Sequence, residues 1–442
     1  MGRRPVRTSL DVYLNDRHVG VLIRATSGAI EFAYDEAWLA WDHSMPVSLS
    51  LPLSTRRYVG APVLAVFENL LPDSDQIRRR LAERVGARGT DAFSLLERVG
   101  HDCVGALQFL PGDEQPSSTR TIDGAVLDDD DIEALLANLS RAPLGVDREV
   151  DEHFRISLAG AQEKTALLWH EGRWLRPHGT TPTTHILKPE IAVPKGGIGL
   201  ADSVENEYYC MKLMEALGFP TARCQISKFG TRKALVVERF DRLWTRDGRL
   251  LRLPQEDCCQ ALSVPPTMKY QADGGPSVVQ IMGLLTGSND PTADRLSFFR
   301  AQIAFWLLGA TDGHAKNFSI FVRSGGAFQL TPLYDVLSVQ PMVDAGQIGR
   351  NAFKVSMAIG NSGKYRLNEI HGRHFVETGK ACGLSATQIG RTLDELREQA
   401  VTAIEAVNTN LPADFPPALV TSITDGIRAR TNKLIVAEEN LP

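Results

Sequence analysis

The features that would assign this chain of 442 residues to several common protein classes are missing. It has six cysteines and no C-x-x-C pattern, so neither a zinc ribbon nor a thioredoxin-type redox site is expected, and the thiols are predicted to be small buried side chains. No apolar run reaches the roughly 18 residues of a membrane span, and "TSLDVYLND" follows the basic start "MGRRPVR" where a signal peptide would be apolar. We therefore expect a protein of the reducing cytoplasm that does not act on a membrane.

An excess of positive charge is also absent. The net charge is -5 and the isoelectric point is about 6.1, which argues against a protein whose main task is to coat nucleic acid. Charged residues make up 23% of the chain, a normal balance for a soluble protein. The length and a hydrophobic content of 43% predict two or three packed units.

The first unit is predicted over residues 1–120 as a small α+β subdomain. "LDVYLNDRHVGVLIR" alternates apolar and polar residues around Asn15-Asp16 and predicts a hairpin, and "AIEFAY" predicts a third strand. "APVLAVFENLLP" and "DSDQIRRRLAERVG" predict helices, the second beginning at Asp73 or Ser74 and ending near Gly86.

Two further units are expected. Apolar content is low between residues 112 and 150, where we place the first boundary. Residues 121–240 are strand-rich with one clear helix, and residues 241–442 become mostly helical from about residue 276. A mixed lobe followed by a helical lobe, with polar loops between them, predicts an α+β protein with a cleft.

Two lysines follow patterns that suit phosphate binding. "FRISLAGAQEKTALLW" places two β-like runs around Ala159 to Gln162, where small residues let backbone N–H groups approach a phosphate, and Lys164 adds charge. The stretch has one glycine and no G-x-G-x-x-G or G-K-[ST], so an ordinary hairpin is the alternative. Lys188 ends the apolar strand of "THILKPE", where it could hold a phosphate or be a plain edge lysine.

A helix with a buried glutamate is predicted in "ADSVENEYYCMKLMEALGFP", capped by Asp202 or Ser203. At about 100° per residue, Glu207 falls inside the apolar face of this helix and Glu205 falls well outside it. A glutamate on a buried face needs a cation. We therefore predict an ion pair between Glu207 and Lys188.

The next polar segments join the two lobes. "KALVVERFDRLW" predicts a buried strand that leads into a connector from Glu238 to Asp241. The backbone of residues 238–240 could bind a flat base, with Phe240 packed near it; a strand end with an Arg–Asp pair is the alternative. "LPQEDCCQAL" and "KYQADGGPS" are predicted to be loops, either lining a site or forming plain turns.

Polar residues interrupt an apolar neighbourhood in "GATDGHAKNFSIF". Asp312, Asn317 and, further on in "LTPLYDVLS", Asp335 give an acid, an amide and a second acid, an order that suits phosphoryl transfer. The first acid would deprotonate a hydroxyl, and Asn317 with Asp335 would hold Mg²⁺. His314 and Lys316 could neutralise charge. For each residue alone, a hydrogen-bonded core group is the alternative.

The order of these parts is that of protein kinases, although H-R-D and D-F-G are absent. At these residues the sequence resembles the HipA-type serine/threonine kinase toxins of bacterial toxin–antitoxin modules. The strings that carry the resemblance are "FENLLPDS", "FRISLAGAQEKTAL", "SVENEYYC", "VVERFDR", "RLPQED", "KYQADGGP", "GATDGHAKNFSIF" and "PLYDV". It implies a protein-kinase-like two-lobe α+β fold with a family-specific N-terminal subdomain and a mostly helical C-terminal lobe, and the use of ATP and Mg²⁺.

The resemblance also implies roles for single residues. Ser157 would be the serine whose autophosphorylation turns the kinase off, because its phosphate would repel ATP. The implied catalytic residues are Asp312, Asn317, Asp335 and Lys188, with Asn317 and Asp335 on the metal. The implied cofactor-binding residues are Ala159, Gly160, Ala161, Gln162, Glu163, Lys164, Lys188, Glu238, Arg239, Phe240, His314, Ala315, Lys316, Asn317, Tyr334 and Asp335.

The partners that the resemblance implies are macromolecules. The substrate would be an aminoacyl-tRNA synthetase, notably the glutamyl enzyme, whose phosphorylation stalls translation and leads to persistence. A HipB-like helix-turn-helix antitoxin would bind the toxin, and operator DNA would be reached only through that complex. The alternatives are an ATP-binding transcriptional co-repressor without protein kinase activity and a small-molecule kinase.

Overall fold

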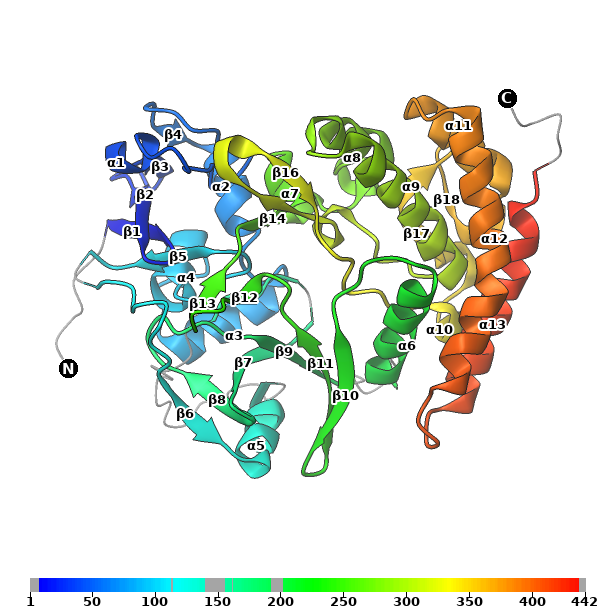
Figure 1. Cartoon of the computed structure of the whole chain (residues 1–442), viewed down its shortest axis with the longest axis horizontal. Coiled ribbons are helices and arrows are strands. Elements are labelled where there is room, and N and C mark those ends of the chain that lie inside the picture. Colours follow the sequence, from blue (N-terminus) through cyan, green and yellow to red (C-terminus); the bar gives the residue numbers. More distant parts are fainter. Residues whose placement is uncertain (1–7, 113, 140–155, 161, 192–201, 437–442) are drawn as a thin grey trace.

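A computed structural model of the chain describes residues 8–112, 114–139, 156–160, 162–191 and 202–436. Their buried apolar side chains gather in three cores, which draw on residues 10–109, 127–236 and 204–434. Figure 1 shows the first of these parts in blue at the upper left, the central sheet below it, and the C-terminal helices on the right. We propose that each core is the centre of one of the three units expected from the sequence.

The N-terminal subdomain is an antiparallel sheet covered by short helices. Its strand order is β4-β3-β2-β1-β5. The predicted hairpin is present, with Asn15 at its turn in the left-handed region (φ 55°). Ser74 caps α3 by accepting a hydrogen bond from the Ile77 N–H, and Gly86 (φ 63°) ends it, as predicted. The elements are β1 (Ser9–Leu14), β2 (Arg17–Arg24), β3 (Ile30–Tyr34), α1 (Glu36–Leu39), β4 (Tyr58–Val59), α2 (Ala61–Glu68), α3 (Asp75–Val85), α4 (Ala92–Val99) and β5 (Leu107–Leu110).

The central unit is a sheet with the order β10-β11-β9-β7-β8-β6. Its elements are β6 (Gly124–Leu127), α5 (Asp129–Leu139), β7 (Thr165–His170), β8 (Arg173–Pro177), β9 (His185–Pro189), α6 (Ser203–Ala216), β10 (Cys224–Phe229) and β11 (Arg232–Glu238). Helix α5 buries Ile132 and Leu136 against Leu167 and Val236 of the sheet. Helix α6 instead packs into the third core, where the Tyr209 hydroxyl donates to Oδ1 of Asn408 at 2.7 Å, so α6 connects sheet and helical lobe.

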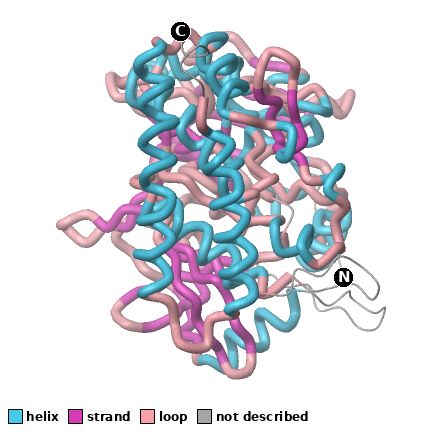
Figure 2. The backbone as a smooth tube through the Cα atoms, turned by 90° about the vertical axis from the view of Figure 1, so that its right-hand side faces the viewer, coloured by secondary structure: helices cyan, strands magenta, loops and turns pink. Residues whose placement is uncertain are grey.

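The C-terminal lobe is mostly helical, as predicted, but several strands lie within it. "LPQEDCCQAL" is not a loop, because it forms β14 and α7, capped by Asp257. Figure 2 shows the long helices that cover this side of the molecule. The elements are β12 (Arg242–Trp244), β13 (Leu250–Arg252), β14 (Gln255–Asp257), α7 (Cys258–Ala261), α8 (Val278–Leu284), α9 (Pro291–Leu308), β15 (Ser319–Val322), β16 (Phe328–Leu330), α10 (Gln340–Asp344), β17 (Lys354–Ile359), β18 (Lys364–Arg366), α11 (Gly372–Ala381), α12 (Ala386–Thr409) and α13 (Pro417–Thr431).

Helix α9 positions the polar stretch that interrupts the apolar sequence. Its side chains from Phe298 to Leu308 are almost all buried, and Gly309, in the left-handed region (φ 68°), ends it. The chain then turns into the 312–317 loop before it enters β15. In the described part of the chain, no helix has the length and apolarity to cross a bilayer.

Candidate active site

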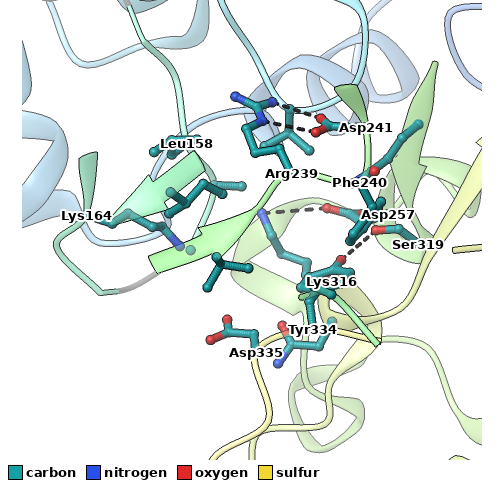
Figure 3. A pocket seen from close by; sticks show the side chains of 18 of the residues that line it. Leu158, Lys164, Arg239, Phe240, Asp241, Asp257, Lys316, Ser319, Tyr334 and Asp335 are labelled. Atoms are coloured by element: carbon teal, nitrogen blue, oxygen red, sulfur yellow. Dashed lines mark hydrogen bonds and ion pairs between the residues drawn. The ribbon is translucent and has the colours of Figure 1, made fainter. Parts of the chain in front are cut away.

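A pocket opens where the three units meet (Figure 3). Its walls come from β9 and β11, from the 157–164 loop and from the 312–317 loop, and the N-terminal subdomain adds the segment that follows α2. Most residues proposed from the sequence line it. They are Ala159, Gly160, Lys164, Lys188, Glu207, Glu238, Arg239, Phe240, Asp312, His314, Lys316, Asn317, Tyr334 and Asp335.

Lys188 is the centre of the charge arrangement in this pocket. Its Nζ atom donates to Oε1 of Glu207 at 2.6 Å and to Oδ1 of Asp335 at 2.7 Å, so the predicted ion pair is present and a second carboxylate joins it. Burial alone would lower the pKa of Lys188, but the two carboxylates raise it above its ordinary value. Burial would likewise raise the pKa of Asp335, but Lys188 and Lys164 hold it well below the usual range. Both groups are therefore charged at neutral pH.

The prediction that Glu205 lies outside the buried face of α6 was wrong. Glu205 is also buried, and its carboxylate pairs with Lys233 on β11. The first turns of α6 are enclosed on two sides, by the central sheet and by the third core, so the usual alternation of a buried and a solvated face does not apply there. The two glutamates differ in their partners and not in their burial.

The 157–164 loop brings its glycine and its lysine together at Gly160. This residue is in a conformation that favours glycine (φ 110°), and a Cβ atom there would lie 2.6 Å from Nζ of Lys164. Burial lowers the pKa of Lys164 to about 8, although Asp335 counteracts the effect. Ala161 lies outside the described residues. A side chain at Gly160 would oblige the ammonium end of Lys164 to shift.

The flanks of this loop differ from the two strands predicted for it. β7 follows the loop; of the run predicted before it, the described part starts at Ile156, which makes an isolated bridge to Asp102 in the N-terminal subdomain. Gln162 donates to the carbonyl of Pro189 at 3.3 Å. The Glu163 carboxylate pairs with Arg80 on α3, away from the pocket floor. The loop is thus held by the N-terminal subdomain, which an ordinary hairpin would not require.

Ser157 is fully buried at the start of this loop. Its hydroxyl donates to the carbonyl of Leu70 at 2.7 Å, and its N–H donates to the carbonyl of Asp102 at 3.0 Å. Both partners belong to the N-terminal subdomain. A phosphate on this hydroxyl has no room in the observed arrangement.

Asp312 is the exposed acid of the site, with a side chain that is 56% exposed. Its Oδ1 atom accepts a hydrogen bond from the Tyr270 hydroxyl at 2.6 Å, and its backbone carbonyl accepts one from Nδ2 of Asn317 at 2.7 Å. The hydrogen bond that Nδ2 donates to this carbonyl fixes the Asn317 side chain. His314 is buried beside Asp312, and burial lowers its pKa, which favours the neutral ring.

Lys316 is held by the N-terminal subdomain. Its Nζ atom lies 2.8 Å from Oδ1 of Asp73 and donates to Oδ1 of Asn69 at 2.9 Å, while Oδ2 of Asp257 is 3.9 Å away. The Asp73 carboxylate also pairs with Nζ of Lys269 at 2.9 Å. These contacts tie the ammonium group of Lys316 to the N-terminal subdomain, so the lysine supports the loop. The sequence left open whether Lys316 supports the loop or neutralises charge.

The connector after β11 supplies an aromatic wall. The Phe240 ring lies 5.8 Å from the rings of both Phe321 and Tyr334. The Arg239 side chain turns away and pairs with Asp241, so only its backbone can face a bound base (Figure 3). The Arg–Asp pair is therefore present together with the aromatic wall, and the two alternatives for this segment do not exclude each other.

Sequence reasoning missed the contribution of four residues. Asn69 and Asp73 come from "FENLLPDS", and Lys269 and Tyr270 begin "KYQADGGP". Both strings were noted as motifs, but Asp73 was considered only as the start of a helix and the other three residues had no role. The signal in each was polar residues beside proline or glycine, and nothing in the sequence shows that the two strings meet across a domain boundary.

Comparisons with known proteins agree on one family. Residues 10–110 match the HipA N-terminal domain and residues 156–404 match the HipA-like C-terminal domain. A putative kinase of Sinorhizobium fredii, Y4mE, is 35% identical over 90% of this chain and 91% of its own. The serine/threonine-protein kinase toxin HipA of Shewanella oneidensis is 27% identical over 91% of this chain and 90% of its own.

A solved structure supports the same fold. The complex of HipA, HipB and operator DNA from Shewanella oneidensis contains a chain that superposes with a TM-score of 0.78, covering 96% of both chains at 24% identity. The expected two-lobe α+β arrangement of this family is therefore confirmed for the chain.

Proposed function

The chain belongs to the HipA family, and from this premise we propose that it is a cytoplasmic serine/threonine protein kinase that uses ATP and Mg²⁺ and acts as the toxin of a toxin–antitoxin module. Relatives named as kinases cover the chain almost end to end. The single observation that carries the proposal is the arrangement around Lys188, whose ammonium group binds Glu207 and Asp335 in the pocket that Asp312 also lines. A lysine paired with a helix glutamate and facing a second acid is the charge pattern of kinase sites.

The donor set of the pocket fits a nucleotide with its metal. Lys164 and Lys188 supply positive charge, and the Gly160 turn leaves open the space that a Cβ atom would fill. Asp335 is held as a charged carboxylate, and Asn317 is fixed through its amide nitrogen, so its oxygen is left for a ligand. Carboxylate and amide oxygens suit Mg²⁺. ATP supplies the phosphoryl group, and Mg²⁺ neutralises its charge.

Asp312 is the base in this proposal. It accepts the proton of the serine hydroxyl that attacks the phosphorus, and its 56% exposure leaves it within reach of a protein substrate. The neutral ring of His314 packs beside it, and Lys316 is engaged elsewhere. The residues that support the loop are thus separate from the residue that moves the proton.

The test is transfer of the γ-phosphoryl group of ATP to protein serine by the full chain and by Asp312→Asn. We expect the variant to bind nucleotide as the wild type does, to transfer phosphate at least about a hundredfold more slowly, and to be harmless when expressed. A wild-type chain that binds ATP and phosphorylates no protein, or a variant that remains fully active, would contradict the proposal.

The partners of the proposed toxin follow from its relatives. The Shewanella oneidensis structure holds HipA together with HipB and operator DNA. We propose an equivalent helix-turn-helix antitoxin for this chain, with operator DNA reached only through the complex. The proposed substrate is an aminoacyl-tRNA synthetase such as the glutamyl enzyme, whose phosphorylation would stop translation. Phosphoproteomics after induced expression should find a synthetase serine, and phosphoserines on other proteins alone would reject this substrate.

Autophosphorylation at Ser157 is the proposed off-switch. Because the hydroxyl is buried against Leu70, the loop must leave the N-terminal subdomain before the serine can be phosphorylated, and the phosphate would then prevent its return. Phosphate at Ser157 after incubation with ATP, with loss of further transfer, is the expected result. An equally rapid loss of activity in Ser157→Ala would reject this switch.

A further inference from the structure

The tyrosine of "KYQADGGP" touches the proposed base. The Tyr270 hydroxyl donates to Oδ1 of Asp312 at 2.6 Å, a short and charge-assisted contact. The nearest nitrogen of His314 is 3.8 Å from the same oxygen. Among the described side chains, Tyr270 makes the shortest contact to this carboxylate, and both contacts go to Oδ1.

Tyr270 is itself held in place by its surroundings. Its ring meets the His314 ring edge to face at 5.0 Å, and Nζ of Lys269 lies 5.3 Å from the ring centroid. Its backbone carbonyl accepts hydrogen bonds from the N–H groups of Asp273 and Gly275 at 3.0 Å each. The hydroxyl is thus carried on a preformed turn.

The second glycine of the motif makes this turn possible. A Cβ atom at Gly275 would lie 1.9 Å from the carbonyl oxygen of Met268 and 2.8 Å from that of Tyr270, so no other residue fits. Gln271 fastens the far side of the turn, because its Oε1 atom accepts a hydrogen bond from the Ala358 N–H at 2.8 Å. The turn that carries the Tyr270 hydroxyl therefore depends on this glycine and is fastened to β17.

A base on an exposed loop needs such a contact. The Asp312 side chain is more than half exposed, and an exposed carboxylate samples several rotamers in water. Proton transfer requires the carboxylate within hydrogen-bond reach of the attacking hydroxyl. A misplacement of about 1 Å can cost about a hundredfold in rate.

We propose that Tyr270 is a positioning residue for phosphoryl transfer, which fixes Oδ1 of Asp312 so that Oδ2 points at the acceptor hydroxyl. This inference rests on the proposed kinase function. Tyr270 neither accepts the proton nor binds the nucleotide. Removal of its hydroxyl should therefore lower kcat and leave the affinity for the nucleotide unchanged.

The test compares Tyr270→Phe with Tyr209→Phe in the full chain. Both substitutions delete one tyrosine hydroxyl that makes a single side-chain hydrogen bond, and neither Tyr209 nor its partner Asn408 lines the pocket. We expect Tyr270→Phe to lower kcat by roughly 10- to 100-fold, with the nucleotide dissociation constant and KM for ATP changed less than about twofold. Tyr209→Phe should keep the wild-type kcat.

The outcomes separate the inference from the proposed function. If the wild type transfers no phosphate, the kinase proposal itself fails. If the wild type is active and Tyr270→Phe keeps its kcat, the positioning role is rejected. A loss of kcat with an equal loss of nucleotide affinity would also reject it, because a general distortion of the pocket would have that signature. A selective fall in kcat supports it.

Discussion

Asp73 of the N-terminal subdomain lies with its Oδ1 atom 2.8 Å from the ammonium group of Lys316 in the 312–317 loop. The other carboxylate oxygen of Asp73 binds Lys269 at 2.9 Å, immediately before Tyr270. One acid therefore holds both segments that reach Asp312. The N-terminal subdomain is in this way a structural part of the proposed active site and not an appendage to a kinase domain.

Replacing this acid should weaken the whole chain. Burial would raise the pKa of Asp73, but Lys316 and Lys269 hold it below its ordinary value, so its contribution to stability is present above the unfolded pKa and is lost as the pH falls. For Asp73→Asn we expect a loss of about 3 kcal/mol in the free energy of unfolding at pH 7. Urea titration measures this loss, and it should shrink as the pH falls below about 4.

Asp91→Asn is the matched control for Asp73→Asn. Asp91 pairs with Arg24, but its side chain is 51% exposed, and asparagine still caps α4. A surface pair of this kind contributes about 0–1 kcal/mol. Equal losses in the two variants would show that the contact between Asp73 and the lysines has no special weight.

The two glutamates of α6 should separate activity from stability. Glu207 binds Lys188 at 2.6 Å, whereas Glu205 binds Lys233 on the sheet. We expect Glu207→Gln to lower kcat/KM for ATP about 10- to 100-fold, because Lys188 loses one of the two groups that orient it. Glu205→Gln should cost about 1 kcal/mol of stability and leave kcat/KM near wild type. Steady-state kinetics with both variants would contradict this if Glu205→Gln were the more damaged enzyme.

The sequence predicted local elements better than their surroundings. The helix cap at Ser74, the hairpin at Asn15 and the pair between Lys188 and Glu207 follow from propensity and periodicity, which act over a few residues. The burial of Glu205 could not be predicted this way, because it depends on a sheet and a distant core that both cover α6.

The roles of Asp73 and Tyr270 lay beyond the sequence for a similar reason. Each is an ordinary polar residue at a turn, and nothing local sets it apart. Asp73 acquires its role only when Lys269, 196 positions away, and Lys316, further still along the chain, fold against it. Spacing along the chain indicated the chemistry of the 312–317 loop. Tertiary contacts decide which polar groups could take part in that chemistry and which ones hold the loop in place.

Nucleotide affinity should depend on the charge of Lys164. Burial lowers the pKa of this lysine to about 8, so in the free protein it loses its proton as the pH rises through 8. Above that pH, binding of phosphates must take up a proton, and the dissociation constant for ATP should rise up to about tenfold per pH unit. Lys164→Arg stays charged, so its affinity should be flat between pH 7 and 9. Calorimetric titrations with identical pH slopes in both proteins would rule out contact between Lys164 and the phosphates.

Glu256 should make the chain less stable as the pH rises from 5 to 8. Burial raises its pKa to about 8, and its Oε1 atom accepts one hydrogen bond from the Leu49 N–H at 2.8 Å. Its unfolded pKa is about 4.3, so between these values the folded chain binds more protons and its stability falls as the pH rises. Glu256→Gln removes this dependence. As the pH rises from 5 to 8, the free energy of unfolding of the variant minus that of the wild type should therefore increase by about 3 kcal/mol. The exposed Glu215→Gln provides the control, with no such gain. Parallel pH profiles for wild type and Glu256→Gln in urea titrations would mean that Glu256 is ionised in the folded chain at neutral pH and is stabilised there by its partners.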